Sequence, residues 1–195
     1  MNVGLLGGTF DPPHLGHLVL ADQCAGALAL DEVAFVLACR PPHKTDRRLT
    51  DFETRRRLLE AALGGDSRFT ILTLESEREG LSYTVETLRA LHAARPADRF
   101  WLLLGEDSLE DLVHWREPLA IAALARLAVY QRFGASHREP DFLRGRVDTV
   151  DGPRIEVSSS WVRAQVRAGR TVGYLVPAPV RDLIHREGLY RNAED

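Results

Sequence analysis

The feature that most constrains this chain is a short apolar run that leads directly into a glycine-containing loop and a helix. Residues 3–6, Val-Gly-Leu-Leu, are followed at residues 7–17 by Gly-Gly-Thr-Phe-Asp-Pro-Pro-His-Leu-Gly-His. A continuous apolar run of this length is typical of a strand buried on both faces. Glycines let the backbone approach a ligand closely, and free N–H groups at a helix start attract anions. We therefore predict a strand, a ligand-binding loop and a helix that presents His14 and His17 to phosphate.

Apolar runs alternate with longer amphipathic stretches along the rest of the chain. We expect strands at residues 2–7, 33–38, 69–74, 100–104, 126–131 and 154–157. We expect helices at residues 15–29, 51–63, 83–94, 107–113, 117–124, 159–168 and 177–187. This alternation predicts an α/β fold in which helices cover both faces of a parallel sheet. Ligands of such sheets bind beyond the carboxyl ends of the strands.

Local signals define the ends of one of these helices and the character of one connecting segment. Thr50 and Glu53 have the spacing of a capping box that opens the helix at 51–63, and Gly64 is placed to end it. The segment 134–153 is rich in Arg, Asp, Gly and Pro, so we expect a surface excursion there.

Length and composition limit the class of protein. The chain has 195 residues, which predicts one domain, and 45 % hydrophobic residues, as in ordinary globular proteins. A net charge of −3 provides no general attraction to nucleic acid or anionic membranes, so we expect neither as a partner. No apolar segment approaches a membrane span, and the start of the chain does not read as a signal peptide. Cys24 and Cys39 lie far apart in no metal-ligand spacing, so we expect them to be reduced and the protein to be cytoplasmic.

Charged groups follow two further expected strands at their carboxyl ends. Pro41-Pro42-His43-Lys44 follows the second strand, and Lys44 offers a compact cation suited to phosphate, unless it is only a solvated surface lysine. Gly105-Glu106-Asp107 follows the run at 100–104. Asp107 either complements the dipole of the next helix or accepts ribose hydroxyls and binds Mg²⁺ through water.

Two other helix starts carry groups suited to ligands. Ser82 is a good candidate to cap the helix that begins near Tyr83, and the free amides of Tyr83 and Thr84 could hold a carboxylate. Trp115 is either a packing residue or a stacking platform for an aromatic ring. Ser158, Ser159 and Ser160 open the helix after the last expected strand. They form an anion nest or an ordinary cap, and Arg163, one turn later, can add a bidentate clamp.

These groups favour one kind of chemistry. A zinc site at His14, His17 and Asp11 is disfavoured because no third soft ligand lies nearby. No Ser–His–Asp order or Cys–His pairing indicates covalent catalysis. The remaining groups recognise phosphates and hydroxyls, which is typical of phosphoryl or nucleotidyl transfer by positioning and charge neutralisation.

Together the motifs resemble the bacterial nicotinate mononucleotide adenylyltransferases of the HxGH nucleotidyltransferase superfamily, over nearly the whole chain. The resemblance rests on residues 7–17, Pro42-His43-Lys44, Ser82-Tyr83-Thr84, Gly105-Glu106-Asp107 with Trp115, and residues 157–163. The chain departs from the family at Val157 and Ser160, where the family usually has Ile and Thr. Arg132-Phe133-Gly134 stands where the family has Arg-Pro-Gly.

The resemblance implies transfer of an adenylyl group from ATP, with Mg²⁺, to nicotinate mononucleotide, giving deamido-NAD and pyrophosphate. It implies a Rossmann-like parallel sheet with helices on both faces, in one nucleotidyltransferase domain at 1–195 whose residues 158–195 form a small C-terminal helical portion. The catalytic residues it implies are His14, His17 and Arg163. ATP would bind Gly8, Thr9, Phe10, His14, His17, Gly105, Asp107, Ser158, Ser159, Ser160 and Arg163. Nicotinate mononucleotide would bind Gly8, Thr9, Lys44, Ser82, Tyr83, Thr84 and Trp115. No side chain is expected to bind the metal directly, because ATP phosphates and water would hold most of its coordination sphere.

Two other functions remain open from the sequence. One is a different HxGH adenylyl- or cytidylyltransferase, such as an enzyme acting on pantetheine phosphate, against which Trp115 and Ser82-Tyr83-Thr84 argue. The other is a nucleotide-binding protein without turnover, or an RNA-binding fragment, although the net charge of −3 disfavours RNA. The oligomeric state, a homo-oligomer included, and the degree of preference for the acid over the amide also remain open.

Overall fold

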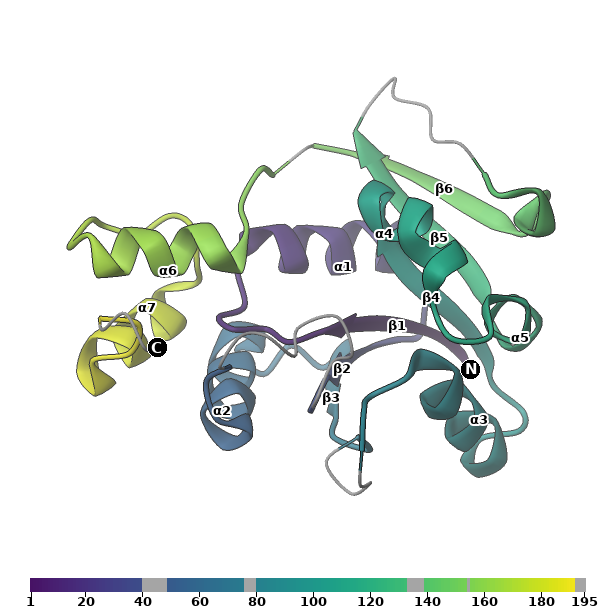
Figure 1. The fold of residues 1–195 in the computed structure, drawn as a ribbon, viewed down its shortest axis with the longest axis horizontal. Coiled ribbons are helices and arrows are strands. Elements are labelled where there is room, and N and C mark those ends of the chain that lie inside the picture. Colours follow the sequence, from purple (N-terminus) through teal and green to yellow (C-terminus); the bar gives the residue numbers. More distant parts are fainter. Residues whose placement is uncertain (40–48, 76–79, 133–138, 154, 192–195) are drawn as a thin grey trace.

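A computed structural model describes residues 1–39, 49–75, 80–132, 139–153 and 155–191 (Figure 1). Its strands are β1 (Asn2–Gly8), β2 (Glu32–Leu37), β3 (Phe69–Leu72), β4 (Arg99–Gly105), β5 (Arg126–Arg132) and β6 (Val147–Gly152). They form one sheet in the order β3-β2-β1-β4-β5-β6, and every neighbouring pair is parallel. The predicted parallel α/β sheet is confirmed. Its strand order reverses between β1 and β4, which is where such sheets bind ligands.

The helices are α1 (Leu15–Ala27), α2 (Phe52–Leu63), α3 (Thr84–Ala94), α4 (Glu106–Asp111), α5 (Pro118–Leu124), α6 (Ser159–Arg167) and α7 (Ala178–Glu187). Each predicted helix is present, with ends that move by a few residues at most. The helix expected at 107–113 is divided into α4 and a short 3-10 turn, Leu112–His114. Over the described residues, no helix is both long enough and apolar enough to cross a membrane.

Helices cover both faces of the sheet. Helices α1 and α2 bury side chains such as Cys24 and Leu59 against one face, together with Phe35 of β2. Helices α3, α4 and α5 bury side chains such as Leu88 and Ile121 against the other. The central strands are therefore apolar on both sides, which explains why they appear in the sequence as continuous apolar runs.

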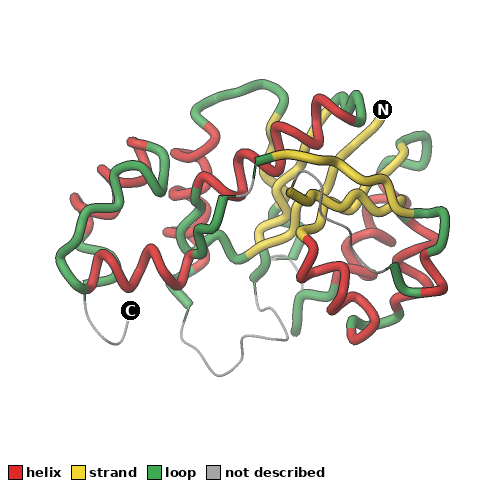
Figure 2. Tube along the Cα trace, turned by 90° about the horizontal axis from the view of Figure 1, so that it is seen from above, coloured by secondary structure: helices red, strands yellow, loops and turns green. Residues whose placement is uncertain are grey.

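Helices α6 and α7 pack on α2 instead of on the sheet. Leu58 of α2 meets Val162 of α6 and Val180 and Ile184 of α7 in a separate buried cluster. Figures 1 and 2 both show α6 and α7 next to α2, at the end of the molecule away from the sheet. The expected C-terminal helical part is thus present. Helix α2 connects this helical part to the sheet, because one face of α2 packs on the sheet and another face packs on α6 and α7.

The position of the sixth strand was predicted wrongly. The strand expected at 154–157 is absent from the described residues of that segment, 155–157, which carry no regular structure. The sixth strand is instead β6, inside the segment 134–153 that was expected to be a surface excursion. Its sequence, Val-Asp-Thr-Val-Asp-Gly, has only two large apolar residues, and Val150 is buried while Asp151 is exposed. This edge strand is covered less completely than the central ones, so it lacks the apolar run that identifies them.

The capping box at the start of α2 was also predicted wrongly. Asp51, not Thr50, is the N-cap, and its Oδ1 accepts a hydrogen bond of 2.9 Å from the amide of Thr54. Asp and Thr are both good N-caps, so the sequence alone does not choose between neighbours. The expected helix end at Gly64 is confirmed, since Gly64 adopts the left-handed conformation with φ of 60°.

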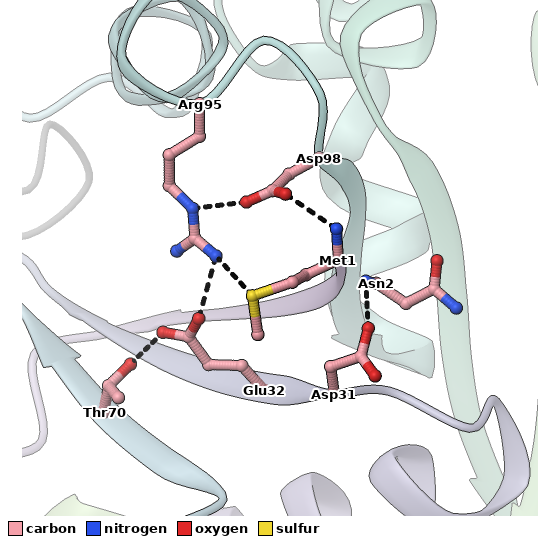
Figure 3. A network of polar contacts seen from close by, with 7 residues as sticks. All are labelled: Met1, Asn2, Asp31, Glu32, Thr70, Arg95 and Asp98. Carbon is pink, nitrogen blue, oxygen red and sulfur yellow. Dashed lines mark hydrogen bonds and ion pairs between the residues drawn. The ribbon is translucent and has the colours of Figure 1, made fainter.

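A network of polar side chains joins the amino ends of several strands (Figure 3). The amino group of Met1 lies 2.7 Å from Oδ1 of Asp98, and Arg95 donates to the same carboxylate. Arg95 also donates to Glu32 at 3.0 Å, and Glu32 accepts from the hydroxyl of Thr70 at 2.6 Å. The network therefore connects β1, β2, β3 and the turn before β4 at the edge of the sheet opposite the carboxyl ends.

We predict that Asp98→Asn destabilises the protein more at pH 7 than at pH 3. Hydrogen bonds from the N-terminal amine and from Arg95 hold the pKa of Asp98 below its ordinary value of 3.8. A carboxyl group with a lowered pKa in the folded state stabilises it above the ordinary pKa, and this stability is lost as pH falls through the lowered pKa. Urea unfolding at pH 7 and pH 3 measures the difference in the free energy of unfolding between wild type and variant. Asp141→Asn, which changes an almost fully exposed carboxylate, is the control. If Asp98→Asn lowered the free energy of unfolding equally at both pH values, the prediction would be contradicted.

Candidate active site

The loop after β1 folds tightly around the ring of Phe10. Phe10 has φ of 46°, a left-handed conformation that few non-glycine residues adopt, and its side chain is 1 % exposed. A Cβ on Gly8 would lie 2.9 Å from the Phe10 ring, so only glycine leaves room for it. The Phe10 ring in turn meets the ring of His17 edge-on, with centroids 5.0 Å apart. The tight loop thus fixes the position of one predicted catalytic histidine.

His14 and His17 form a stacked pair at the start of α1. Their ring centroids are 3.7 Å apart, and the amide of His14 donates to Nδ1 of His17 at 3.2 Å. A Cβ on Gly16 would lie 3.1 Å from the His14 ring, which explains the glycine between the histidines. Nδ1 of His14 is buried and faces the His17 amide, but it makes no hydrogen bond of normal geometry with the described residues. Burial lowers the pKa of His14 to about 4, so His14 is neutral at pH 7 in the free protein.

Asp11 anchors this loop to three distant segments. Its side chain is buried, and Oδ1 accepts a hydrogen bond of 2.8 Å from the hydroxyl of Tyr190, beyond α7. Its Oδ2 accepts from the amide of Thr50 at 3.4 Å, and its backbone carbonyl accepts from the guanidinium of Arg163 in α6. Burial raises the pKa of the Tyr190 hydroxyl, so it stays protonated and donates to Asp11. The loop, α2, α6 and the C-terminal end therefore meet at one residue.

Arg55 supports the same loop from α2, and the sequence reasoning missed it. Its side chain is 2 % exposed, and its Nη1 donates to the carbonyls of Thr9 at 3.0 Å and Ala38 at 2.7 Å. Its Nε donates to Thr50 at 2.8 Å. The guanidinium thus holds the carboxyl ends of β1 and β2 together. The one signal in the sequence was an arginine on the apolar face of α2, beside Leu58.

Of the three serines before Arg163, Ser159 connects α6 to the loop, and the other two make hydrogen bonds within α6. Ser158 is the N-cap, as one of the two sequence interpretations had it, and accepts a backbone hydrogen bond of 3.1 Å. The hydroxyl of Ser159 donates to the carbonyl of Pro12 at 2.8 Å, and that of Ser160 accepts from Arg163 at 3.1 Å. In the free protein these groups therefore bind protein atoms, and Arg163 is 5 % exposed. Their role toward an anion stays a prediction.

A cavity of about 560 Å³ opens over the carboxyl ends of β1 and β4, at the point where the strand order reverses. This is the size range of small-molecule sites. Its wall contains many of the residues predicted to bind substrates: Gly8, Thr9, His17, Ser82, Tyr83, Thr84, Gly105 and Trp115. Tertiary structure therefore brings together residues that lie as much as a hundred positions apart in the chain.

The start of α3 presents backbone amides to this cavity. Tyr83 is the N-cap and has no side-chain hydrogen bond to the helix, so the prediction that Ser82 caps it is wrong. The hydroxyl of Ser82 instead accepts from the amide of Cys39 at 3.2 Å, because the end of β2 lies beside it. Within the described residues, the amides of Tyr83 and Thr84 donate no hydrogen bond. Trp115 is half-buried, lines the same cavity and packs against the core.

The other predicted residues lie outside the cavity wall. Phe10 is buried, His14 is the N-cap of α1, and Arg163 and the serines belong to the first turns of α6. Asp107 is exposed in the first turn of α4, directly after the wall residue Gly105. Lys44 is outside the described residues, as are Phe133 and Gly134. No cluster of three or more His, Cys, Asp and Glu side chains in the described segments could hold a metal.

Charged residues that the sequence reasoning did not consider also line the cavity. Glu75 is 9 % exposed and accepts a hydrogen bond of 2.9 Å from the hydroxyl of Thr87. The guanidinium carbon of Arg116 lies 4.6 Å above the ring of Tyr83. Neither residue belongs to a motif, so only their placement in the folded chain identifies them.

Comparison with known proteins agrees with this geometry. Residues 5–165 match the cytidylyltransferase-like family. A probable nicotinate-nucleotide adenylyltransferase of Geobacillus kaustophilus is 44 % identical over 188 residues, which cover 96 % of this chain and 85 % of that protein. A protein of Salinibacter ruber with the same name is 42 % identical over 193 residues, which cover 98 % of each chain. The chain belongs to the nicotinate-nucleotide adenylyltransferase family.

Solved structures extend the likeness of fold within the nicotinate-nucleotide adenylyltransferase family. The nicotinic acid mononucleotide adenylyltransferase of Plasmodium falciparum, complexed with NaAD, has a TM-score of 0.82 and 20 % identity, and the match covers 97 % of each chain. The same enzyme complexed with APC has a TM-score of 0.79 and 21 % identity, and the match covers 97 % of this chain and 96 % of that one. The sheet and the C-terminal helices are thus retained at low sequence identity.

We predict that Tyr190→Phe lowers the free energy of unfolding by about 1–3 kcal/mol, because it removes a hydrogen bond to a buried carboxylate. Urea unfolding at pH 7 measures the loss. Tyr174→Phe is the matched control, because Tyr174 is 93 % exposed and the same hydroxyl is removed. Equal effects of the two substitutions would show that the bond to Asp11 does not anchor the C-terminal end.

We predict that His14 titrates near pH 4 in the free protein and at higher pH when pyrophosphate is bound. Burial disfavours the imidazolium, whereas a nearby anion favours it. Imidazole ¹⁵N–¹H correlation spectra recorded across pH 3–8, with and without pyrophosphate, give both pKa values. A pKa near 6.5 in the free protein would contradict the burial argument.

Proposed function

We propose that this protein transfers the adenylyl group of ATP to nicotinate mononucleotide, giving deamido-NAD and pyrophosphate, in NAD biosynthesis. One observation carries the proposal. One cavity at the switch point of the sheet is lined by His17 of α1 and also by Tyr83, Thr84 and Trp115. The first group suits phosphates and the second suits an aromatic carboxylate. Membership of the nicotinate-nucleotide adenylyltransferase family supports the same reaction.

The proposed reaction is a direct displacement at phosphorus. An oxygen of the mononucleotide phosphate attacks the α-phosphorus of ATP, and a new P–O–P bridge forms. The bond from the α-phosphorus to the bridging oxygen breaks, and pyrophosphate leaves with that electron pair. The protein would contribute by aligning the two phosphates and by neutralising negative charge, without a covalent intermediate.

The loop histidines would stabilise the charge that develops at the α-phosphate. His17 lines the cavity, and the rings of Phe10 and His14 hold it on two sides. Gly8 and Thr9 line the same cavity. Donors that are fixed before the reaction stabilise a transition state without the cost of reorganisation.

ATP would extend from the loop toward α6. We assign its triphosphate to the helix start with Ser158, Ser159, Ser160 and Arg163, where amides and the helix dipole favour an anion. We assign its ribose to Gly105 and Asp107. Mg²⁺ would be bound by the ATP phosphates and water, with the exposed carboxylate of Asp107 available to hold that water, and would neutralise charge on the leaving pyrophosphate.

Nicotinate mononucleotide would occupy the side of the cavity next to α3. The amides of Tyr83 and Thr84 are donors at a helix start, so a carboxylate can accept from both of them. A carboxamide has one accepting oxygen, and its NH₂ group would face a donor. Trp115 would stack on the pyridine ring, and the hydroxyl of Ser82, held by Cys39, fixes the turn before α3. We assign the mononucleotide phosphate to Lys44.

We also propose that residues 1–195 act as one nucleotidyltransferase domain in which 158–195 form a C-terminal helical portion. The support is that α2 packs on both the sheet and the helices α6 and α7, and that Asp11 binds Tyr190. Cys24 and Cys39 are both free, which supports a reducing, cytoplasmic setting.

Pyrophosphate release tests the proposed function. The protein is incubated with ATP and Mg²⁺ and with nicotinate mononucleotide, nicotinamide mononucleotide or pantetheine phosphate. We expect a kcat/KM for the acid about 10²–10³ times that for the amide, since each unpaired donor costs about 1–3 kcal/mol. Release with pantetheine phosphate but not with the acid would instead identify another member of the superfamily, and no release in any mixture would remove the enzymatic function.

We predict that His17→Ala lowers kcat by about 10²–10³ and changes KM much less, because its donor acts on charge that appears only in the transition state. Steady-state kinetics with both substrates measure the two constants. His185→Ala, which removes an exposed histidine of α7, is the control. A kcat of His17→Ala close to that of the wild type would remove His17 from the mechanism.

A further inference from the structure

The described wall of the cavity carries one arginine and one acidic side chain. Among the described residues that line it, Arg116 is the one Lys or Arg side chain and Glu75 is the one carboxylate. Arg116 directly follows Trp115, so the same short turn brings an indole and a cation to the site. An adjoining smaller cavity is also lined by Arg116, Ser82 and Tyr83. The cation therefore lies beside the turn whose amides are assigned to the substrate carboxylate.

The contacts of Arg116 leave much of its charge available. Its guanidinium carbon lies 4.6 Å above the Tyr83 ring, which holds the group in place without neutralising it. Its Nε is 3.8 Å from Oε1 of Glu117, but Glu117 has a closer partner in Arg89, at 2.6 Å. The side chain of Arg116 is 52 % exposed, so its interactions with a ligand are partly screened by solvent.

Glu75 contributes the opposite charge to the same wall. Its Oε1 is held by Thr87 at 2.9 Å, and its buried Oε2 has no hydrogen-bond partner among the described residues. A substrate carboxylate that enters the cavity is repelled by Glu75. A carboxamide, which has no net charge, is not. Without a compensating cation, the fixed charge of the wall would therefore favour the amide over the acid.

We propose that Arg116 is a specificity-determining residue that favours nicotinate mononucleotide over its amide. Its guanidinium offsets Glu75 and attracts the carboxylate of the ring, whereas a neutral carboxamide gains little from it. This inference rests on the proposed function and adds to it a charge-based source of selectivity beside the amide donors of α3. A merely structural role in holding Tyr83 would affect both substrates alike.

Equilibrium binding of the two mononucleotides tests the inference without requiring turnover. Calorimetric Kd values for the acid and the amide are measured on the full chain and on Arg116→Gln and Arg116→Lys. We expect Arg116→Gln to lower the acid-over-amide preference about fivefold, the size typical of a partly exposed ion pair, through weaker binding of the acid. Arg116→Lys keeps the charge and should retain most of the preference. Arg144→Gln removes an equal charge from a side chain that is 83 % exposed before the amino end of β6, and should change nothing.

The dependence of the acid-over-amide preference on ionic strength gives a second test of the inference. Raising the salt concentration should reduce the preference of the wild type and have less effect on Arg116→Gln, because salt screens a partly exposed charge. An unchanged preference in Arg116→Gln, or equal weakening of acid and amide, would overturn the inference. Failure of the proposed function is distinct from this, because it would appear as no pyrophosphate release by the wild type with either mononucleotide.

Discussion

Asp11 is the residue on which the arrangement of the site depends. Its buried carboxylate accepts hydrogen bonds from Tyr190 and Thr50, and its carbonyl accepts one from Arg163. Buried acceptors that lose their partners are costly, so these donors fix where the C-terminal helices and α2 stand relative to the loop. Arg55 of α2 adds a second constraint by donating to the carbonyls at the ends of β1 and β2. The loop is thereby rigid before any substrate arrives.

The site has two parts with different physical character. The loop side consists of stacked imidazoles, backbone groups and a helix start, all held in place by packing around Phe10. The cavity side has an apolar floor from β1 and β4 and a rim that carries Trp115 and the amides of α3. Phosphates and an aromatic acid need these two environments side by side. A reaction that depends on aligning two bound phosphates is suited to such a preorganised arrangement.

Local charge, and not the charge of the whole protein, decides what the cavity attracts. The net charge is −3, yet the described wall of the cavity pairs one carboxylate, Glu75, with one guanidinium, Arg116. Charges in the wall act over short distances even where solvent partly screens them, as at Arg116, whereas distant surface charges are screened more completely. On the proposed function, selectivity between an acid and its amide would depend on a few fixed groups beside the α3 turn.

The sequence by itself determined the parallel α/β class, the helices and the loop with His14 and His17, because periodicity, glycines and helix starts are local properties of the chain. It also predicted that Tyr83, Thr84 and Trp115 belong together, through the resemblance of their motifs to one family. Tertiary structure alone decided the place of β6, since an edge strand with few apolar residues resembles a polar loop. It alone revealed Arg55, Glu75 and Arg116, and the bond from Tyr190 to Asp11, because these roles depend on partners far away in the chain. The N-cap of α2 is Asp51 and not Thr50, because neighbouring residues that can both cap a helix are distinguished by what each one contacts in the folded protein.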